Sequence, residues 1–195
     1  MFVTFEGLDG CGKTTQAALL AQSLRDEGVD VVATREPGGT ALGEAIRNLV
    51  LHGDHVAPWA EAALYAASRA QHVEEVIRPA LDRGATVVCD RYIDSSVAYQ
   101  GVGRGLGLDE VLDLNLAVVG GLVPDKTVLV EIDVETALAR VGETGDRIER
   151  AGAEFWPRVV EAYGALAARF PDRFVVVDGR RSIPRIAEEI RDRLR

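Results

Sequence analysis

Residues 7–14 read GLDGCGKT and match the pattern G-x-x-x-x-G-K-[ST]. The apolar run FVTF at residues 2–5 stands directly before them, and the helix-forming run TTQAALLAQSL at residues 14–24 follows. A buried strand, a glycine-rich turn and a helix in this order are typical of a loop that wraps around phosphate groups. The stretch therefore predicts binding of a nucleoside triphosphate.

The residue types in this loop each have a physical reason. Gly7, Gly10 and Gly12 let the backbone approach an anion, because glycine has no side chain and tolerates positive φ. The Lys13 ammonium is expected to reach the β- and γ-phosphates, and the Thr14 hydroxyl to ligate Mg²⁺. The residues predicted to bind the triphosphate are Gly7, Leu8, Asp9, Gly10, Cys11, Gly12, Lys13, Thr14 and Thr15.

Composition limits the class of protein. The 195 residues are 47% hydrophobic, which is enough for one globular domain with its own core. A net charge of −9 argues against nucleic acid as a partner, because phosphate backbones attract a basic surface. No apolar run approaches membrane-spanning length, and the chain opens on a strand-like run rather than a signal peptide. We therefore expect a cytoplasmic protein with no membrane contact, in which Cys11 and Cys89 form no disulfide.

Strand-like apolar runs alternate with longer helical patterns along the chain. This alternation is typical of βαβ units and predicts a single α/β domain over residues 1–195, with a doubly wound, five-stranded parallel sheet flanked by helices. Ligands are expected at the carboxyl ends of the strands. The predicted strands are 2–6, 29–35, 86–89, 126–132 and 174–177.

The helical segments carry their own signals. Apolar positions at helical spacing predict one long helix over residues 59–81. A short helix is predicted near residues 96–100, followed by the glycine-rich loop GVGRGLG at 101–107. Asp109 and Asp133 are predicted N-caps of the helices that follow them, because a short carboxylate accepts hydrogen bonds from free backbone amides. The other predicted helices are 13–26, 41–50, 154–170 and 184–195.

Polar residues gather where the second and third predicted strands end. Glu36 and Pro37 follow the second strand, and Asp90 and Arg91 follow the third. Arg69 adds a guanidinium on an otherwise apolar turn of the long helix, where a salt-bridged side chain is an equal alternative. Two arginines and several acids around one crevice predict a second, phosphorylated ligand facing the triphosphate.

Five stretches resemble a known family. GLDGCGKTT (7–15), TREPGGT (34–40), SRAQH (68–72), DRYIDSSVAYQG (90–101) and GDRIE (145–149) occur in the order and spacing of bacterial thymidylate kinases, over essentially the whole chain. The chain is thus similar to a family of phosphate-loop kinases. The resemblance implies phosphorylation of dTMP to dTDP with ATP as the phosphoryl donor and Mg²⁺ as the metal, a step in dTTP biosynthesis.

The resemblance implies roles for the residues around the acceptor phosphate. Asp9 corresponds to an acid that contacts the sugar 3′-hydroxyl, and Arg69 and Arg91 to the arginines that hold the monophosphate. Arg91 is also expected to neutralise charge on the phosphoryl group in transfer. Asp90 corresponds to the strand-end carboxylate that holds Mg²⁺ with Thr14, and a helix cap is the alternative for it.

For the nucleoside, the resemblance implies contacts from two helical segments. Ser96 corresponds to the residue that hydrogen-bonds the pyrimidine edge, and Tyr99 to the ring that crowds the 2′ position, with Gln100 beside it. Tyr65 stands where the family usually has phenylalanine stacked on thymine, and tyrosine keeps the stacking face. The implied dTMP contacts are Asp9, Glu36, Pro37, Tyr65, Arg69, Arg91, Ser96, Tyr99, Gln100 and Glu149.

The resemblance also implies a lid at about residues 142–150. Because position 10 is glycine rather than arginine, a lid arginine is expected to act in catalysis, either Arg140 or Arg147. Arg180, after the last strand, is expected to stack on adenine. A homodimer through helices 59–81 and 109–119 is implied as well. The implied catalytic residues are Lys13, Arg91, Asp9, Arg147 and Arg140.

Two alternatives of other classes remain. Another deoxynucleotide kinase, or a deoxynucleoside kinase, would share the architecture. A deoxynucleoside kinase needs a general base for a sugar hydroxyl, and Glu36 is the candidate. A non-catalytic switch that binds a triphosphate is the more remote alternative, since the sequence has no Asn-Lys-x-Asp guanine signature.

Overall fold

The computed structural model describes residues 1–141, 147–148 and 154–194. In these residues five strands form one parallel sheet in the order β2-β3-β1-β4-β5, so the predicted doubly wound, five-stranded parallel sheet is confirmed. The strands are β1 (Phe2–Glu6), β2 (Val31–Arg35), β3 (Thr86–Asp90), β4 (Lys126–Glu131) and β5 (Phe174–Asp178).

The central strand β1 delivers the stretch 7–14 to the carboxyl edge of the sheet. Phe5 pairs in register with Asp90 of β3 on one side and with Val128 of β4 on the other. The ends of β1 and β3 therefore lie side by side. Because loops that follow parallel strands emerge at the same edge, the phosphate-binding stretch and the Asp90-Arg91 pair face one crevice.

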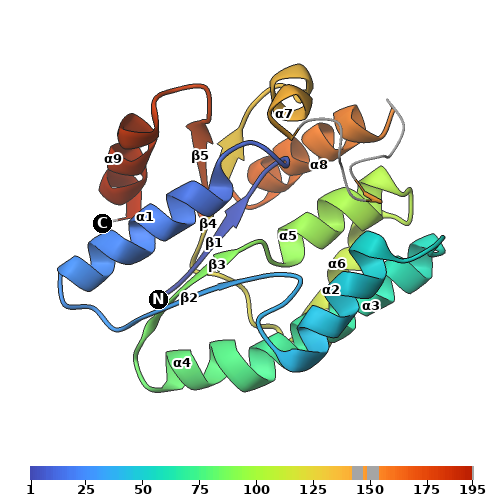
Figure 1. The fold of residues 1–195 in the computed structure, drawn as a ribbon, viewed down its shortest axis with the longest axis horizontal. Coiled ribbons are helices and arrows are strands. Elements are labelled where there is room, and N and C mark those ends of the chain that lie inside the picture. The colour runs from blue at the N-terminus through green and yellow to red at the C-terminus, as the bar shows by residue number, and fades with distance from the viewer. Residues whose placement is uncertain (142–146, 149–153, 195) are drawn as a thin grey trace.

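Helices cover both faces of the sheet, as the apolar character of its strands requires. Figure 1 shows α1 and α9 together on one side and α5, α6 and α8 on the other. Two π-helical segments, η1 (Val73–Ile77) and η2 (Val97–Gly103), continue α3 and α5. The α-helices are α1 (Lys13–Asp26), α2 (Ala41–His52), α3 (Pro58–His72), α4 (Arg78–Asp82), α5 (Ile93–Ser96), α6 (Leu108–Val118), α7 (Val134–Val141), α8 (Phe155–Arg169) and α9 (Ile183–Leu194).

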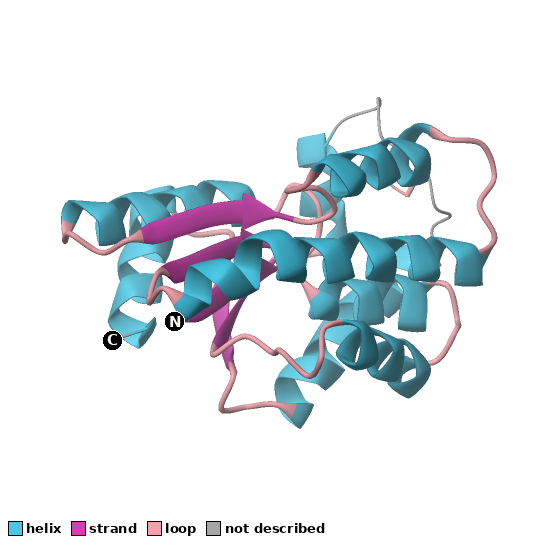
Figure 2. Ribbon diagram, turned by 90° about the horizontal axis from the view of Figure 1, so that it is seen from below, coloured by secondary structure: helices cyan, strands magenta, loops and turns pink. Residues whose placement is uncertain are grey.

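The long helix predicted over residues 59–81 is helical throughout but is not one regular helix. It runs as α3, η1 and α4, which appear as a single long rod across Figure 2. At its π-helical turn the Arg78 amide donates to the Val73 carbonyl, five residues back. The next residue, Pro79, has no amide hydrogen and its ring crowds the preceding turn, which favours such a widened turn.

Several boundaries differ from the prediction, most of them by one or two residues. The short helix predicted at 96–100 is longer, because α5 and η2 together span 93–103 and include the start of the glycine-rich segment. Helix α6 starts at Leu108 with Gly107 as its N-cap, so Asp109 is not the cap. The Asp109 carboxylate instead lies in the first turn of α6, where the helix dipole favours a negative charge, and it pairs with Arg169 at 2.5 Å. Asp133 caps α7 as predicted, accepting the Thr136 amide at 2.7 Å.

Strand β2 begins at Val31 rather than at residue 29. The end of α1 uses the intervening backbone, because Gly28 and Val29 donate their amides to Arg25 and Leu24. These are the hydrogen bonds of a helix that ends on a left-handed glycine. None of the helices in the described ranges is long and apolar enough to cross a membrane.

Candidate active site

The loop after β1 is shaped by its glycines. A Cβ added to Gly7 would lie 2.5 Å from the Val130 carbonyl oxygen, so only glycine fits against β4 there. Gly12 is the N-cap of α1 with a left-handed φ of 99°. Among the described residues no side chain caps α1, which leaves its first amides free to bind an anion.

Lys13 lies over this loop. Its ammonium donates to the Leu8 carbonyl at 3.1 Å and to the Asp9 carboxylate at 3.0 Å. The side chain is almost fully buried, so its charge is held in place where phosphates would lie. Leu8 and Cys11 are buried beneath the loop, while Thr15 is exposed in the first turn of α1.

The Thr14 and Asp90 side chains meet where β1 and β3 end. The Thr14 hydroxyl donates to one Asp90 oxygen at 2.5 Å. The other Asp90 oxygen, Oδ1, is buried and has no hydrogen-bond partner among the described residues. A hydroxyl next to a carboxylate oxygen that lacks a partner fits a hard divalent cation such as Mg²⁺. No side chain in the described part of the chain caps α5, which removes the helix-cap alternative for Asp90.

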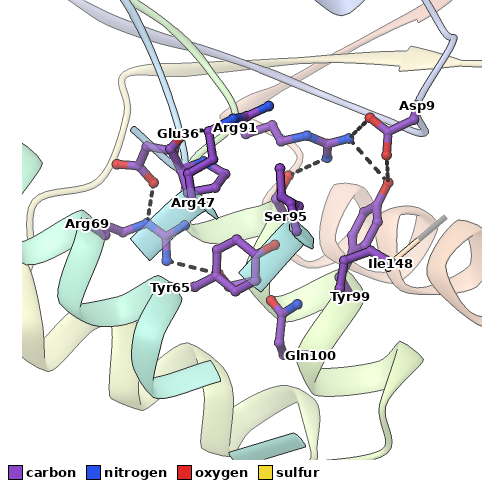
Figure 3. A pocket seen from close by; sticks show the side chains of 13 residues that line it. Asp9, Glu36, Arg47, Tyr65, Arg69, Arg91, Ser95, Tyr99, Gln100 and Ile148 are labelled. Carbon is purple, nitrogen blue, oxygen red and sulfur yellow. Dashed lines mark hydrogen bonds and ion pairs between the residues drawn. The ribbon is translucent and has the colours of Figure 1, made fainter. Parts of the chain in front are cut away.

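Arg91 stands in a left-handed backbone conformation with φ 73°, which costs roughly 1–3 kcal/mol for a residue with a side chain. The turn directs its guanidinium back across the crevice. There it contacts Asp9 at 2.5 Å, donates to Ser95 Oγ at 2.8 Å and lies 5.0 Å from the Tyr99 ring centre. Figure 3 shows Arg91 between Asp9 and Ser95.

Asp9 connects the phosphate loop to the opposite wall. One of its oxygens contacts both Lys13 and Arg91, and the Tyr99 hydroxyl donates to the other at 3.4 Å. Burial alone raises the pKa of Asp9, but the charges of Arg91 and Lys13 hold that pKa well below its ordinary value. Burial likewise opposes the charge of Arg91, and the Asp9 carboxylate nevertheless keeps the Arg91 pKa well above its usual range. Both groups are therefore ionised at neutral pH.

A pocket opens between Asp9 and the helices of the far wall. Figure 3 shows Asp9 and Arg91 along one side and Tyr65 and Gln100 along the other. Its lining combines residues from six separate segments of the chain. They are Asp9, Glu36, Pro37, Arg47, Leu51, Tyr65, Arg69, Arg91, Ser95, Ser96, Tyr99, Gln100 and Ile148. Every predicted dTMP contact in the described residues is thus on the wall of one pocket.

Arg69 is the most enclosed cation of this pocket, with 2% of its surface exposed. It donates to Glu36 at 2.7 Å, to Ser96 at 3.0 Å and to the Tyr92 carbonyl at 2.9 Å, and it also contacts Asn115. Each of its three nitrogens therefore already has a protein acceptor.

Glu36 is buried between two donors. One oxygen accepts from Arg69, and the other lies 2.9 Å from His72 Nδ1. The Glu36-Pro37 peptide bond, whose isomer the sequence leaves open, is cis. Tyr99 is also buried, and its ring meets Phe155 and Trp156 edge to face.

The two candidate lid arginines lie in different places. Arg140, in α7, is exposed and donates to the Gly10 carbonyl of the phosphate loop at 3.2 Å. Arg147 instead binds the buried Glu61 carboxylate at 2.6 Å and donates to the Val50 carbonyl at 2.9 Å. The predicted lid edge residue Glu149 lies outside the described residues.

Arg180 follows β5 and is exposed. It pairs with Asp178 at 2.8 Å and lines a hollow with Ile132 and Asp133. This hollow lies beyond the ends of β4 and β5, on the far side of the phosphate loop from the acceptor pocket.

Sequence reasoning missed several wall residues. Arg47 donates to the Pro37 carbonyl at 3.1 Å and adds a third arginine to the pocket. Its only signal is its position on an amphipathic helix after the Glu36-Pro37 turn. The stretch 90–101 could have indicated Ser95 as a pocket residue, because it is adjacent to the predicted Ser96. Ile148, which is buried on the pocket wall, has no signal of its own.

A triphosphate-binding loop that shares one carboxylate with a second, arginine-lined pocket defines the class of phosphate-loop kinases that act on nucleoside monophosphates. A family model described as thymidylate kinase matches residues 5–190. The chain belongs to the thymidylate kinase family.

Individual relatives cover nearly the whole length. The chain is 56% identical to the thymidylate kinase of Leifsonia xyli subsp. xyli, over 100% of this chain and 94% of that one. It is 54% identical to that of Clavibacter michiganensis subsp. michiganensis, over 99% and 93%. The crystal structure of thymidylate kinase from Ehrlichia chaffeensis superposes with a TM-score of 0.84 at 36% identity, covering 100% of this chain and 98% of that chain.

Proposed function

We propose that this protein transfers the γ-phosphoryl group of ATP to dTMP, producing dTDP and ADP. The observation that carries the proposal is the position of Asp9. Its carboxylate contacts Lys13 of the phosphate loop and Arg91 of the acceptor pocket. The donor and acceptor sites therefore meet at one residue, as direct transfer between two bound nucleotides requires.

The acceptor phosphate is assigned to the Arg91 end of the pocket. Arg91 and Arg47 are the two pocket arginines whose donors are not all committed to buried protein acceptors. Asp9 and Tyr99 are assigned to the sugar, where the buried Tyr99 ring leaves little space beside the 2′ position. Deoxyribose is favoured over ribose for that steric reason.

The base is assigned to the opposite end, between Tyr65 and the Ser96–Gln100 segment. The resemblance implies a phosphate contact for Arg69, but we do not assign one. Its nitrogens are all bound by protein acceptors, and Ser96 is one of these acceptors. Arg69 is assigned the task of holding Ser96 at the pyrimidine edge. Gln100 donates one amide hydrogen to the buried Glu61 carboxylate at 2.9 Å, and we assign its carbonyl oxygen to the base.

The transfer needs no general base. A phosphate monoester has its second pKa near ~6 and is already largely dianionic at neutral pH. The protein must bring two anions together and offset the charge that spreads over the equatorial oxygens. We assign this task to Lys13 and Arg91, and Arg140 is the third candidate because it donates to the Gly10 carbonyl of the phosphate loop. We assign the exclusion of water from this assembly to the lid expected at about residues 142–150, of which only 147–148 are among the described residues.

Mg²⁺ would be held by Thr14 and Asp90. When bound, it would draw charge from the phosphate oxygens of ATP and orient them. For the adenine of ATP we propose the hollow beside Arg180, whose exposed guanidinium is free to stack on a flat base.

A deoxynucleoside kinase is not favoured. Its general base would have to be Glu36, but both oxygens of that carboxylate accept hydrogen bonds from buried donors. A carboxylate whose two oxygens each accept a hydrogen bond from a buried donor is stabilised in its charged form and is therefore a weaker base toward a substrate hydroxyl.

The test is ADP release in the presence of ATP and Mg²⁺ with dTMP, dUMP, UMP, AMP or thymidine as acceptor. We expect dTMP to be the preferred acceptor and thymidine to be inactive. A preference for any of the other four would overturn the proposal.

We also propose a homodimer in the cytoplasm. The outer face of α3 exposes Trp59 and a row of alanines, Ala60, Ala63 and Ala67, which allow close approach of a second helix. Light scattering on the purified protein should give twice the chain mass of 21.0 kDa. Trp59→Glu should lower that mass if α3 forms the interface, whereas a monomeric parent protein would contradict the proposal.

A further inference from the structure

Glu6 is a fully buried carboxylate to which the reaction as described gives no task. It is the last residue of β1, directly before the phosphate loop. Burying a carboxylate is unfavourable unless donors surround it, so its partners indicate what it contributes.

One oxygen of Glu6 holds the backbone next to Arg91. Oε1 accepts the Tyr92 amide at 2.8 Å. Arg91 itself still donates its amide to the Phe5 carbonyl at 2.9 Å, and its left-handed φ then turns the chain out of the sheet. The Tyr92 amide therefore lies beyond the last ladder hydrogen bond of β3. Glu6 satisfies it, so the backbone is held by a hydrogen bond at Arg91 and by another at the residue that follows.

The other oxygen of Glu6 acts on the Arg91 side chain through Ser95. Oε2 accepts the Ser95 hydroxyl at 2.5 Å. A hydroxyl has a single proton, so Ser95 Oγ must act as an acceptor toward Arg91 Nη1 at 2.8 Å, and it also lies 3.1 Å from the Tyr163 hydroxyl. A carboxylate here thus sets the direction of the Ser95 hydrogen bonds. The Arg91 guanidinium lies between this serine and Asp9, as Figure 3 shows.

We propose that Glu6 is a positioning residue that holds both the backbone and the guanidinium of Arg91 in the geometry for phosphoryl transfer. This proposal rests on the role assigned to Arg91 above. Asp9 already has Lys13 as a second partner, so an arriving phosphate can take its place at Arg91. The Glu6-Ser95 contact lies on the other side of the guanidinium and stays in place throughout.

The main test compares Glu6→Leu with Glu6→Gln. Leucine removes both acceptors, and we expect kcat with dTMP to fall about 100-fold, the loss typical of a misplaced catalytic group. The KM for ATP should change less than about threefold, because the phosphate loop is not altered. Glutamine keeps an acceptor for the Tyr92 amide and should lose less than about tenfold. A folded Glu6→Leu variant with the parent kcat would overturn the proposal.

Two further variants separate positioning from stability. Ser95→Ala breaks only the side-chain route and should lower kcat about tenfold. Tyr163→Phe is the matched control, because the Tyr163 hydroxyl donates to Glu6 Oε2 at 3.0 Å and lies 3.1 Å from Ser95 Oγ, but within the described residues it makes no hydrogen bond to Arg91. It should shift the melting temperature yet leave kcat within about twofold. If Glu6→Leu does not fold, a parent-like kcat in Ser95→Ala overturns the proposal instead.

Arg91→Lys shows which proposal has failed. If Arg91→Lys lowers kcat and a folded Glu6→Leu does not, Arg91 keeps its role and the inference about Glu6 is wrong. If neither variant changes kcat, the role assigned to Arg91 is wrong, and the Glu6 proposal that rests on it falls too.

Discussion

Arg91 and Arg69 are both largely buried arginines of the acceptor pocket, but the structure holds them in opposite ways. Arg69 is on a regular helix, and buried acceptors surround it on all three nitrogens. Arg91 follows a strand in a strained conformation and contacts one carboxylate that it shares with Lys13. The arrangement of Arg69 is structural, because each of its nitrogens is already bound by protein. The arrangement of Arg91 leaves a cation whose partner can be exchanged for a substrate phosphate.

The comparison predicts the largest loss of activity at Arg91. Arg91→Ala should lower kcat about 10³-fold, because a charge aimed at the transferred phosphoryl group is removed. Stability should change little, since Asp9 keeps Lys13 as its partner. Steady-state kinetics and ATP binding measured on the same sample check this. A kcat and an ATP affinity that fall by equal factors would contradict the assignment of Arg91 to the transition state.

At Arg69 the larger effect should be on folding. Arg69→Met leaves the buried Glu36 carboxylate without its main cation, and breaking such a pair costs about 3–5 kcal/mol. Urea unfolding measures the loss. The double variant Arg69→Met with Glu36→Gln should recover part of it, because the unpaired charge is gone. If Arg69→Met kept its stability and instead lost only dTMP binding, Arg69 would resemble Arg91 and the contrast would fail.

Stability near Arg91 should also depend on pH, because Glu6 titrates there. The pKa of Glu6 is raised to about 7, mainly by burial and in addition by the nearby Asp94 carboxylate, while Arg91 opposes the rise. A raised carboxyl pKa means that the folded state holds a proton which the unfolded state has lost, so Glu6 costs stability as the pH rises from about 4.5 to about 7. Glu6→Gln does not titrate.

The melting temperature of the parent protein relative to Glu6→Gln should therefore fall as the pH rises from 5 to 8. The corresponding loss in the free energy of unfolding should not exceed about 3 kcal/mol, since a tenfold change in a protonation equilibrium corresponds to about 1.4 kcal/mol. Two parallel curves over this range would show that Glu6 has an ordinary pKa.

The contrast also explains what the sequence could predict. The phosphate loop and the Thr14-Asp90 pair follow from local patterns, because a strand, a glycine turn and the end of a parallel neighbour are each encoded over a few residues. The two states of Arg69 and Arg91 are not encoded locally. The acceptors of Arg69 come from the loop after β2, from α5 and the residue before it, and from α6, and Asn115 has no motif around it.

Two further features needed the fold itself. Glu6 looks like an ordinary strand end until Ser95 and Tyr163 are brought to it from α5 and α8. The π-helical turn at Val73–Ile77 adds a single residue to a helical repeat, and the apolar periodicity is too coarse to register that. Arg47 was missed for the same reason, since only the packing of α2 turns it toward the pocket.

The two candidate lid arginines differ in the same way as Arg91 and Arg69. Here we expect the smallest effect on kcat. Arg140 has one contact to the phosphate loop and is exposed, so Arg140→Ala should lower kcat about tenfold and leave stability unchanged. Arg147 is bound to Glu61, a fully buried carboxylate that also accepts from Arg104 and Gln100. Arg147→Ala should therefore lower the melting temperature, because the buried Glu61 carboxylate loses one of its two arginine partners. Measuring kcat and unfolding for both variants decides between them. A larger kcat loss in Arg147→Ala at unchanged stability would move the catalytic charge to residue 147 and place it with Arg91 rather than with Arg69.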